Sequence, residues 1–305
     1  MRIVKISIIF LSICVFNRVY GQFSHGELGR FEYNIVPNLG ESQLERYHIA
    51  INFGKKIKKS LLLMGLDYSY YDIIYNEANV PFKTDPFEQF HIFSTSFTYL
   101  RTLSNGWALN LTFAPTLSSN LESKLTKEDI IYNSFLGITK RWHKNLKKSR
   151  LLIGLAYGTR FGEPQFFPLI NFTKTVNDRI KYYLGIPITG IDYSISQKNK
   201  ISLKAQPLGF YVNNSEELTV FKQGNFENSK LRLNMINFSV EYNHKFSPMI
   251  ETISSLGYTM VNTFDVLNTE NNIIHDYDPN GSFQFSMGLK INLNKQLNEN
   301  KKVNK

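Results

Sequence analysis

The chain has 305 residues, of which 20% are charged and 42% are hydrophobic, and its formal net charge is +10. This balance excludes a disordered chain and leaves room for one large β domain or two ordinary domains. No run of 18 apolar residues follows the N-terminal segment. A helical membrane protein is therefore excluded, whereas a transmembrane barrel, whose strands are apolar on one face only, is allowed.

The first residues contain the parts of a secretory signal peptide in their usual order. Arg2 and Lys5 precede an apolar run at residues 6–16, and a small residue stands directly before Gln22. We therefore predict a cleaved signal peptide at residues 1–21 and export of the mature chain.

The composition of the mature chain follows from this cut. The only cysteine, Cys14, falls inside the apolar run, so the mature chain is expected to contain no thiol. Removal of the segment also takes away three positive charges and lowers the formal charge from +10 to +7. The remaining excess is scattered, apart from a basic tail at residues 295–305 that we predict to be disordered. Because no basic helix with interleaved aromatic residues occurs, nucleic acid is not an expected partner.

Stretches with an apolar residue at every second position fill the rest of the chain, with almost no helical pattern between them. Residues 46–54, for example, place Tyr47 and Ile49 on one face and the intervening residues on the other. This period is that of a β-strand with one apolar face. The fourteen stretches are 31–37, 46–54, 61–71, 91–100, 107–115, 132–142, 150–161, 166–175, 180–187, 190–196, 200–212, 235–244, 254–264 and 282–294.

The last stretch shows this alternation most fully. Residues 282–294 read SFQFSMGLKINLN, in which residues such as Gln284 and Lys290 alternate with apolar ones. We predict that this is the closing strand of a transmembrane barrel and that its apolar face meets lipid. The side chains expected on that face are Phe283, Phe285, Met287, Leu289, Ile291 and Leu293.

Strand length and aromatic placement both favour a membrane barrel. The stretches run to roughly ten residues, near the length that crosses a hydrocarbon layer at a tilt, whereas soluble sandwiches use about five or six. Aromatic residues also gather at strand ends, as in the interfacial girdles of a barrel. They are Tyr68, Tyr70, Tyr71, Tyr99, Trp107, Trp142, Tyr182, Tyr183 and Tyr242.

The connections alternate between short and long, as in bacterial barrels with short inner turns, long outer loops and both termini inside. Short connections fall at residues 54–59, 102–106, 142–148 and 244–248, and long ones at 72–87, 117–130, 213–229 and 265–281. The alternation holds only if residues 182–196 form two strands broken at Pro187–Gly190, where a proline removes a ladder donor. The prediction is an all-β, antiparallel, up-and-down transmembrane β-barrel over residues 22–294, with about 14 strands and 12 as the alternative.

The order of three segments resembles a known family. FPLINFTKT (167–175), YYLGIPITGIDYSIS (182–196) and KISLKAQPLGF (200–210), set among alternating strands, resemble an uncharacterised family of Gram-negative outer-membrane β-barrels, called domains of unknown function. The resemblance implies an outer-membrane location and no assigned activity. Many such barrels end on an aromatic residue, whereas this chain continues past Leu293, so the assembly signal is expected internally, at residues 283–293.

The alternation also assigns ionisable side chains to the interior of the barrel. Four are cationic and two are anionic, which predicts a slightly positive lining that favours small anions. An equally weighted alternative is a set of internal ion pairs that hold the barrel closed. The residues are Asp67, Arg141, Arg160, Lys204, Glu241 and Lys290.

Motifs for metal binding or catalysis are weak. None of the six histidines has a spacing that binds zinc. HDYDPNG (275–281) matches the first half of a calcium loop, but position 12 is Met287 where a glutamate is needed, so a turn is the better interpretation. A catalytic triad assembled from distant strands would leave no local motif. We predict no metal site, no cofactor and no enzymatic activity.

These observations support several hypotheses about function. The first is a narrow pore or passive transport element for small solutes in the outer membrane. The alternatives are a non-conducting barrel whose outer loops bind a partner and, less favoured, a barrel-embedded lipid hydrolase or an exported soluble β protein. The expected partners are outer-membrane lipid and, during insertion, the barrel-assembly machinery; the sequence identifies neither a solute nor a protein partner.

Overall fold

The computed structural model describes residues 27–40, 42–75, 80–144, 147–277 and 279–292. The predicted signal peptide (1–21), the predicted basic tail (295–305) and Leu293 lie outside these residues. Within them, no helix is both long enough and apolar enough to cross a membrane.

Fourteen strands form the wall of a barrel, and three shorter strands lie in its loops. The wall consists of β1 (Glu27–Leu39), β2 (Ser42–Ile57), β3 (Ser60–Tyr75), β4 (Gln89–Thr102), β5 (Trp107–Ser119), β6 (Ile130–Lys144), β7 (Lys147–Gly158), β8 (Gln165–Thr175), β9 (Ile180–Ile186), β10 (Thr189–Ser194), β11 (Asn199–Asn213), β14 (Lys230–Lys245), β15 (Ile250–Leu267) and β17 (Ser282–Asn292). The loops hold β12 (Leu218–Val220), β13 (Gly224–Phe226), β16 (Ile273–Asp276) and the 3₁₀ turns η1 (Asp85–Phe87), η2 (Ser104–Gly106) and η3 (Lys127–Asp129).

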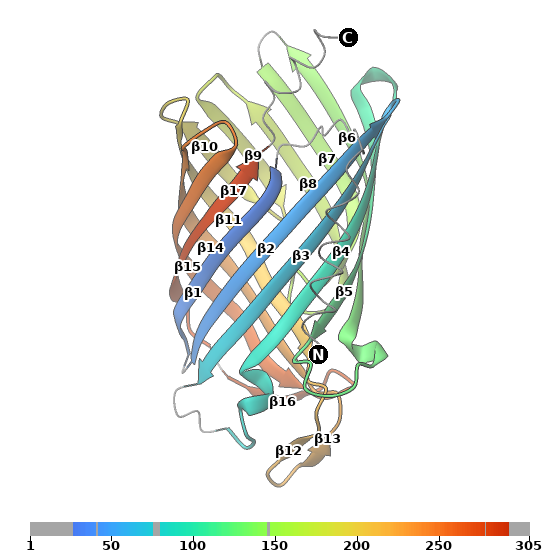
Figure 1. Ribbon diagram of the computed structural model, residues 1–305, viewed down its shortest axis with the longest axis vertical. Coiled ribbons are helices and arrows are strands. Elements are labelled where there is room, and N and C mark those ends of the chain that lie inside the picture. Colours follow the sequence, from blue (N-terminus) through green and yellow to red (C-terminus); the bar gives the residue numbers. More distant parts are fainter. Residues whose placement is uncertain (1–26, 41, 76–79, 145–146, 278, 293–305) are drawn as a thin grey trace, which may run out of the picture.

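Each barrel strand pairs antiparallel with the next, and β1 pairs with β17 to close the wall (Figure 1). At this seam Phe31 lies opposite Leu289. The structure therefore confirms the predicted closed, antiparallel barrel and the larger of the two strand counts. The predicted break is confirmed too, because β9 ends at Ile186 and β10 begins at Thr189.

Strand length differs from the prediction of roughly ten residues. β10 has 6 residues and β15 has 18. The long strands continue past the exposed apolar band into one end of the barrel, where their side chains are buried on the inside. The period-2 pattern underestimated them because the apolar side chains change faces there: in β14, Leu233 and Met235 are buried inside, whereas Ile236 and Phe238 are exposed outside.

The two ends of the barrel differ in their connections. At one end, short turns join β2 to β3, β4 to β5, β6 to β7 and β14 to β15. The other end carries the long connections that follow β3, β5, β11 and β15, together with the protruding β12–β13 hairpin (Figure 1). The four short and four long connections that were predicted therefore lie at opposite ends, and the second end also has short connections at β1–β2, β7–β8 and β9–β10. Following the rule for bacterial barrels, we call the first end inner and the second outer.

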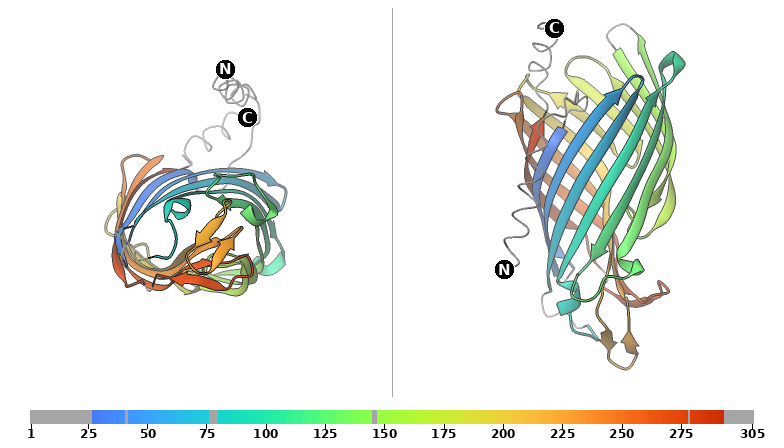
Figure 2. Two further views of the ribbon diagram at one scale, coloured as in Figure 1. Left: turned by 90° about the horizontal axis from the view of Figure 1, so that it is seen from below. Right: turned by 45° about the vertical axis from the view of Figure 1, so that its right-hand side comes forward.

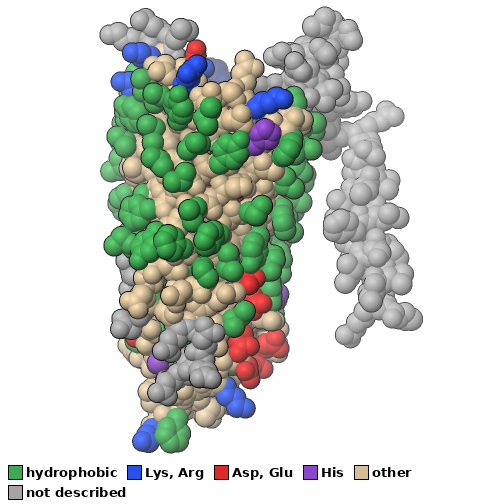
Figure 3. Space-filling view, turned by 90° about the vertical axis from the view of Figure 1, so that its left-hand side faces the viewer, with side chains coloured by type: hydrophobic (Ala, Val, Ile, Leu, Met, Phe, Trp, Pro, Cys, Tyr) green, Lys and Arg blue, Asp and Glu red, His purple; other side chains and the backbone are tan. Residues whose placement is uncertain are grey.

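The outside of the wall is apolar, with charged side chains gathered toward the two ends (Figure 3). On β17 the side chains of Phe283, Phe285, Met287, Leu289 and Ile291 are 46% to 67% exposed on this face. A soluble barrel buries such side chains inside, whereas a lipid-facing wall presents them outward. Of the aromatic residues at strand ends, Trp107, Trp142 and Tyr242 are exposed, whereas Tyr71 is buried inside the barrel.

The closing seam leaves no room for a side chain at Gly288 in β17. A Cβ there would lie 2.6 Å from the Phe31 carbonyl oxygen of β1, whereas a Cβ at Gly29 would meet nothing closer than 3.5 Å. We expect Gly288→Ala to push the two strands apart and to cost about 1–3 kcal/mol, as overpacking does. The temperature at which the folded band is lost on a heat-modifiability gel should fall.

Gly29→Ala, on the partner strand of the same seam, is the matched control and should leave that temperature unchanged. Equal temperatures for both variants would show that the β1–β17 approach is not as close as described.

Candidate functional site

The inside of the outer end is filled by a cluster of apolar side chains, which we call the plug. Each of its residues is 9% exposed or less. Burial of a large apolar side chain contributes about 1.5–3 kcal/mol, so the plug is a substantial core. Wall strands contribute Val36, Leu39, Leu44, Tyr71, Ile73, Phe90, Phe210, Val212, Leu231, Leu233, Met235, Phe264 and Val266, and loops contribute Phe82, Phe87, Leu218 and Val220.

The plug forms because the wall narrows at this end. β9 and β10 are short, so residues 165–169 of β8 and 206–213 of β11 have no partner in them. β11 instead reaches β5, six strands away in barrel order, where Asn213 pairs with Ser119 in parallel. Seen from the outer end, the segment with η1 and the β12–β13 hairpin lie across the opening (Figure 2).

Three buried polar residues hold β11 at its contact with β5: Asp129, Asn213 and Lys230. The Asn213 amide donates to the Asp129 carboxylate at 2.8 Å, and the Lys230 ammonium donates to the Asn213 carbonyl oxygen at 2.8 Å. Lys230 also pairs with Glu128 at 3.1 Å. Asp129 and Lys230 are 0% and 2% exposed. Because a buried unpaired charge is costly, these groups hold the closure only as a complete set.

The ionisation of Asp129 depends on these contacts. Burial alone would raise the pKa of this carboxyl, but hydrogen bonds from Ser119, Asn213 and Thr126 outweigh it and lower the pKa. The carboxylate is therefore the stable form in the closed mouth.

A second group of charges ties the β7–β8 loop to the outer wall. Arg232 of β14 pairs with Glu163 of that loop at 2.9 Å and also with Asp265 of β15. Gly162 of the same loop approaches the backbone of Leu233. The loop thus covers the stretch of β11 that lacks a neighbouring strand.

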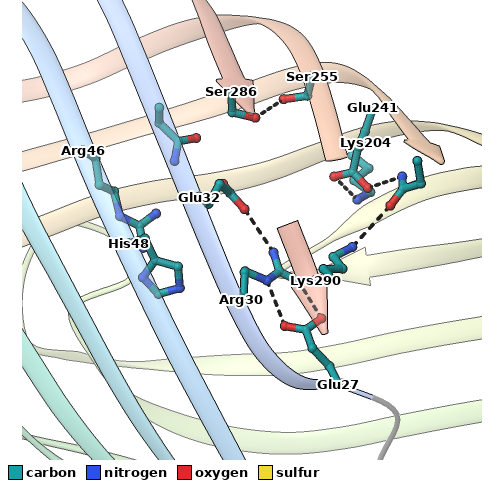
Figure 4. Close-up of polar contacts among 12 residues, drawn as sticks. Glu27, Arg30, Glu32, Arg46, His48, Lys204, Glu241, Ser255, Ser286 and Lys290 are labelled. Carbon is teal, nitrogen blue, oxygen red and sulfur yellow. Dashed lines mark hydrogen bonds and ion pairs between the residues drawn. The ribbon is translucent and has the colours of Figure 1, made fainter. Parts of the chain in front are cut away.

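A polar cavity of about 700 Å³ lies inside the barrel, on the side of the plug that faces the inner end. Its lining includes Arg46 and His48 of β2, which project inward (Figure 4). Nearer the inner end, Arg30 forms ion pairs with Glu27 at 2.9 Å and with Glu32 at 3.2 Å. At this level the lumen therefore holds an open space with charged side chains in its lining and is not filled.

The structure brings three of the six predicted lumen residues together. Lys204 and Glu241 form an ion pair at 2.6 Å, as one of the two alternatives for the lining expected. Asn243 joins Lys290 to this pair, because it accepts from Lys290 at 3.3 Å and donates to Glu241 at 2.7 Å. Asp67 lies apart from them, 3.3 Å from His48.

The other two predicted lumen residues are cations at different levels of the barrel. Arg160 lines the cavity from the β7–β8 loop. Arg141 is exposed near the inner end of β6, opposite Arg150 of β7. Neither forms an ion pair with a described residue.

Sequence reasoning missed several lumen residues that the structure makes prominent. Arg46 and His48 occupy the polar positions of residues 46–54, so the same alternation could have found them. Asp129, Asn213 and Lys230 had no such signal, because they lie at strand ends or in a loop and meet only through the fold.

A serine, a histidine and an aspartate converge in the lumen without the geometry of a hydrolase. His48 Nδ1 lies 3.0 Å from Ser69 Oγ and 3.3 Å from Asp67 Oδ1. A catalytic triad needs the serine and the acid on different ring nitrogens. In the described ranges, no group of three or more histidine, cysteine, aspartate or glutamate residues could hold a metal ion.

The closed wall, the exposed apolar face and the polar lumen define a β-barrel of the outer-membrane type. The profile of the family described as Domain of unknown function (DUF6268) matches residues 44–296. The chain belongs to this family, which confirms the resemblance seen in the sequence. No curated protein matches the chain.

Solved structures of outer-membrane proteins are similar to this chain at low identity. The KdgM porin is 7% identical, with 87% of this chain and 99% of that chain covered and a TM-score of 0.37. An outer-membrane channel from Pseudomonas putida F1 is 9% identical (92% and 100% covered, TM-score 0.42), and LpxR from Salmonella typhimurium is 7% identical (86% and 99% covered, TM-score 0.41).

Removal of the Asp129 carboxylate should loosen the outer mouth. Asp129→Ala leaves the buried Asn213 amide without its acceptor, which costs about 1–3 kcal/mol. We expect faster proteolysis of residues 119–130 in the folded protein. Glu122→Ala removes an exposed carboxylate from the same loop and should leave the rate unchanged.

The lowered pKa of Asp129 also predicts a pH dependence. The stabilisation is complete above the ordinary aspartate pKa of about 3.9 and is lost as the pH falls through the lower folded value. Proteolysis of the wild type by an acid-active protease should accelerate in that window and approach the rate of Asp129→Ala. A constant ratio of the two rates down to pH 2 would contradict this role.

Proposed function

We propose that the protein is a channel of the outer membrane for small polar solutes, and that its outer mouth is closed in this structure. The observation that carries the proposal is the polar cavity enclosed by the fourteen-stranded wall. Eight strands leave an interior that side chains fill, and sixteen or more leave an open water channel. A barrel of intermediate size with a hydrated lumen suits a narrow passage.

Opening of this passage would require two movements at the outer end: displacement of the loops and separation of β11 from β5. Phe82 and Phe87 come from the β3–β4 connection, and Leu218 and Val220 come from β12. β11 meets β5 through the single pair Asn213–Ser119, whereas neighbouring wall strands are held by continuous backbone ladders. Displacement of the loop side chains and separation of this pair would leave a gap bordered by the wall.

The lining charges favour anions over cations. Lys204 and Glu241 neutralise each other, and Arg30 is flanked by Glu27 and Glu32. Arg46, Arg141, Arg150 and Arg160 form no ion pair with a described carboxylate. A passage with this excess of positive charge would select small anions.

A non-conducting barrel that docks a partner is the second candidate. It is favoured by the closed mouth and by the projecting β12–β13 hairpin, whose tip residue Phe221 is 71% exposed. An exposed aromatic ring at the end of an outer loop is a typical anchor for a partner.

Single-channel recording in a planar bilayer separates the two candidates. The wild type should open rarely, and Phe82→Ser/Phe87→Ser should raise the fraction of time spent open by about tenfold or more. The reason is that each buried ring contributes about 1.5–3 kcal/mol to the closed mouth. The currents should prefer anions.

Phe221→Ser is the matched control, because its ring lies outside the plug, and it should behave as the wild type does. Heat-modifiable migration establishes that each variant is folded. If the folded double variant inserts and passes no current, the channel proposal fails and the docking barrel takes its place.

A further inference from the structure

Two buried amide side chains in the cavity carry polar atoms without a partner. Asn34 of β1 and Gln284 of β17 are 7% and 6% exposed and line the cavity. Gln284 donates to the Asn34 carbonyl oxygen at 3.2 Å across the closing seam. The Asn34 Nδ2 and the Gln284 Oε1 then have no partner. In either orientation of the two amides, the pair holds one unpartnered donor and one unpartnered acceptor, both buried beside the cavity.

The strand register sets a guanidinium group beside this pair. Arg46 of β2 lies directly opposite Asn34, so their side chains leave the wall about 5 Å apart on the same face. Its other neighbours are Ser69, which accepts from it at 3.1 Å, and the ring of Tyr71 at 5.7 Å. Asp67 lies near enough to attract this charge, but no described carboxylate forms an ion pair with Arg46.

A second guanidinium faces the same space. Arg160 lines the cavity and lies close enough to Arg46 for the two positive charges to repel each other. It makes no hydrogen bond or ion pair with a described residue. Two cations in one lumen, neither of them in an ion pair with a described carboxylate, are stabilised by an anion that both can contact.

The wall opposite these polar groups is apolar. In barrel order β8 is seven strands from β1 in both directions, so the two strands face each other across the lumen. β8 and the β9–β10 turn present Phe167, Leu169 and Ile188 to the cavity. At its outer end the cavity is bounded by the plug, including Phe210 and Leu233. A bound molecule would thus meet cations and amides on one side and hydrocarbon on the other.

We propose that this cavity is a binding site for a small organic anion with an apolar body, such as an aromatic carboxylate. The carboxylate contacts Arg46, Arg160 and the free Asn34 donor, and the apolar body lies against Phe167 and Leu169. The proposal deepens the proposed channel by naming its solute class, and it rests on that function only for the solute's passage. Binding itself requires the cavity alone.

Calorimetric titration of the folded, detergent-solubilised protein with benzoate tests the site without measuring current. Acetate, which lacks the apolar body, and benzyl alcohol, which lacks the charge, are titrated in parallel. Benzoate should bind at least about tenfold more tightly than either. Arg46→Gln and Arg160→Gln should each weaken benzoate binding about tenfold or more, because a hydrogen bond to a charged group contributes about 1.5–3 kcal/mol.

Arg179→Gln, in the exposed β8–β9 turn, is the control and should bind benzoate as the wild type does. Leu169→Ser should weaken the binding of benzoate but not that of acetate. Equal binding of benzoate by the wild type and both lumen arginine variants, or no binding at all, would overturn the site. Binding in a protein that never conducts would leave the site standing and refute only the channel.

Discussion

Complete pairing of strand edges is the constraint on which this structure depends. In a hydrocarbon layer an unpaired backbone group costs several kcal/mol, so the wall must close. The β1–β17 seam satisfies this at the level of the exposed apolar band. β9 and β10 do not extend to the outer end, so the strand edges there are covered in another way. β11 pairs with β5, and the β7–β8 loop covers the remaining edge of β11.

The functional geometry follows from that second closure. A narrower outer end brings the strand ends together, and their inward side chains then form the plug instead of a hydrated lumen. Toward the inner end the wall has its full circumference. The cavity there is lined by polar groups on β1 and β2 and by apolar groups on β8. The closed mouth and the two-sided cavity are thus consequences of one short hairpin, β9–β10, on the far side of the barrel from the seam.

The sequence predicted the wall because lipid imposes a period of 2 on every crossing strand, and the proline at residue 187 marked the short hairpin. It did not predict the plug, since Phe82 and Phe87 lie in a segment without periodicity. Nor did it predict the contacts of Asn213 with Asp129 and Ser119, which join segments far apart in the chain. Alternation alone assigned Lys204 and Glu241 to the inward face, whereas their pairing depends on the β11–β14 register.

The central claim is that the contact between β5 and β11 closes the lumen. Ser119→Cys/Asn213→Cys places two thiols at the paired positions of this contact, in a mature chain that is expected to contain no other cysteine. Currents through the same inserted channels are recorded before and after addition of a reductant. The account predicts that the disulfide forms and silences the channel, and that reduction restores openings. Unchanged currents through channels locked by the disulfide would contradict it.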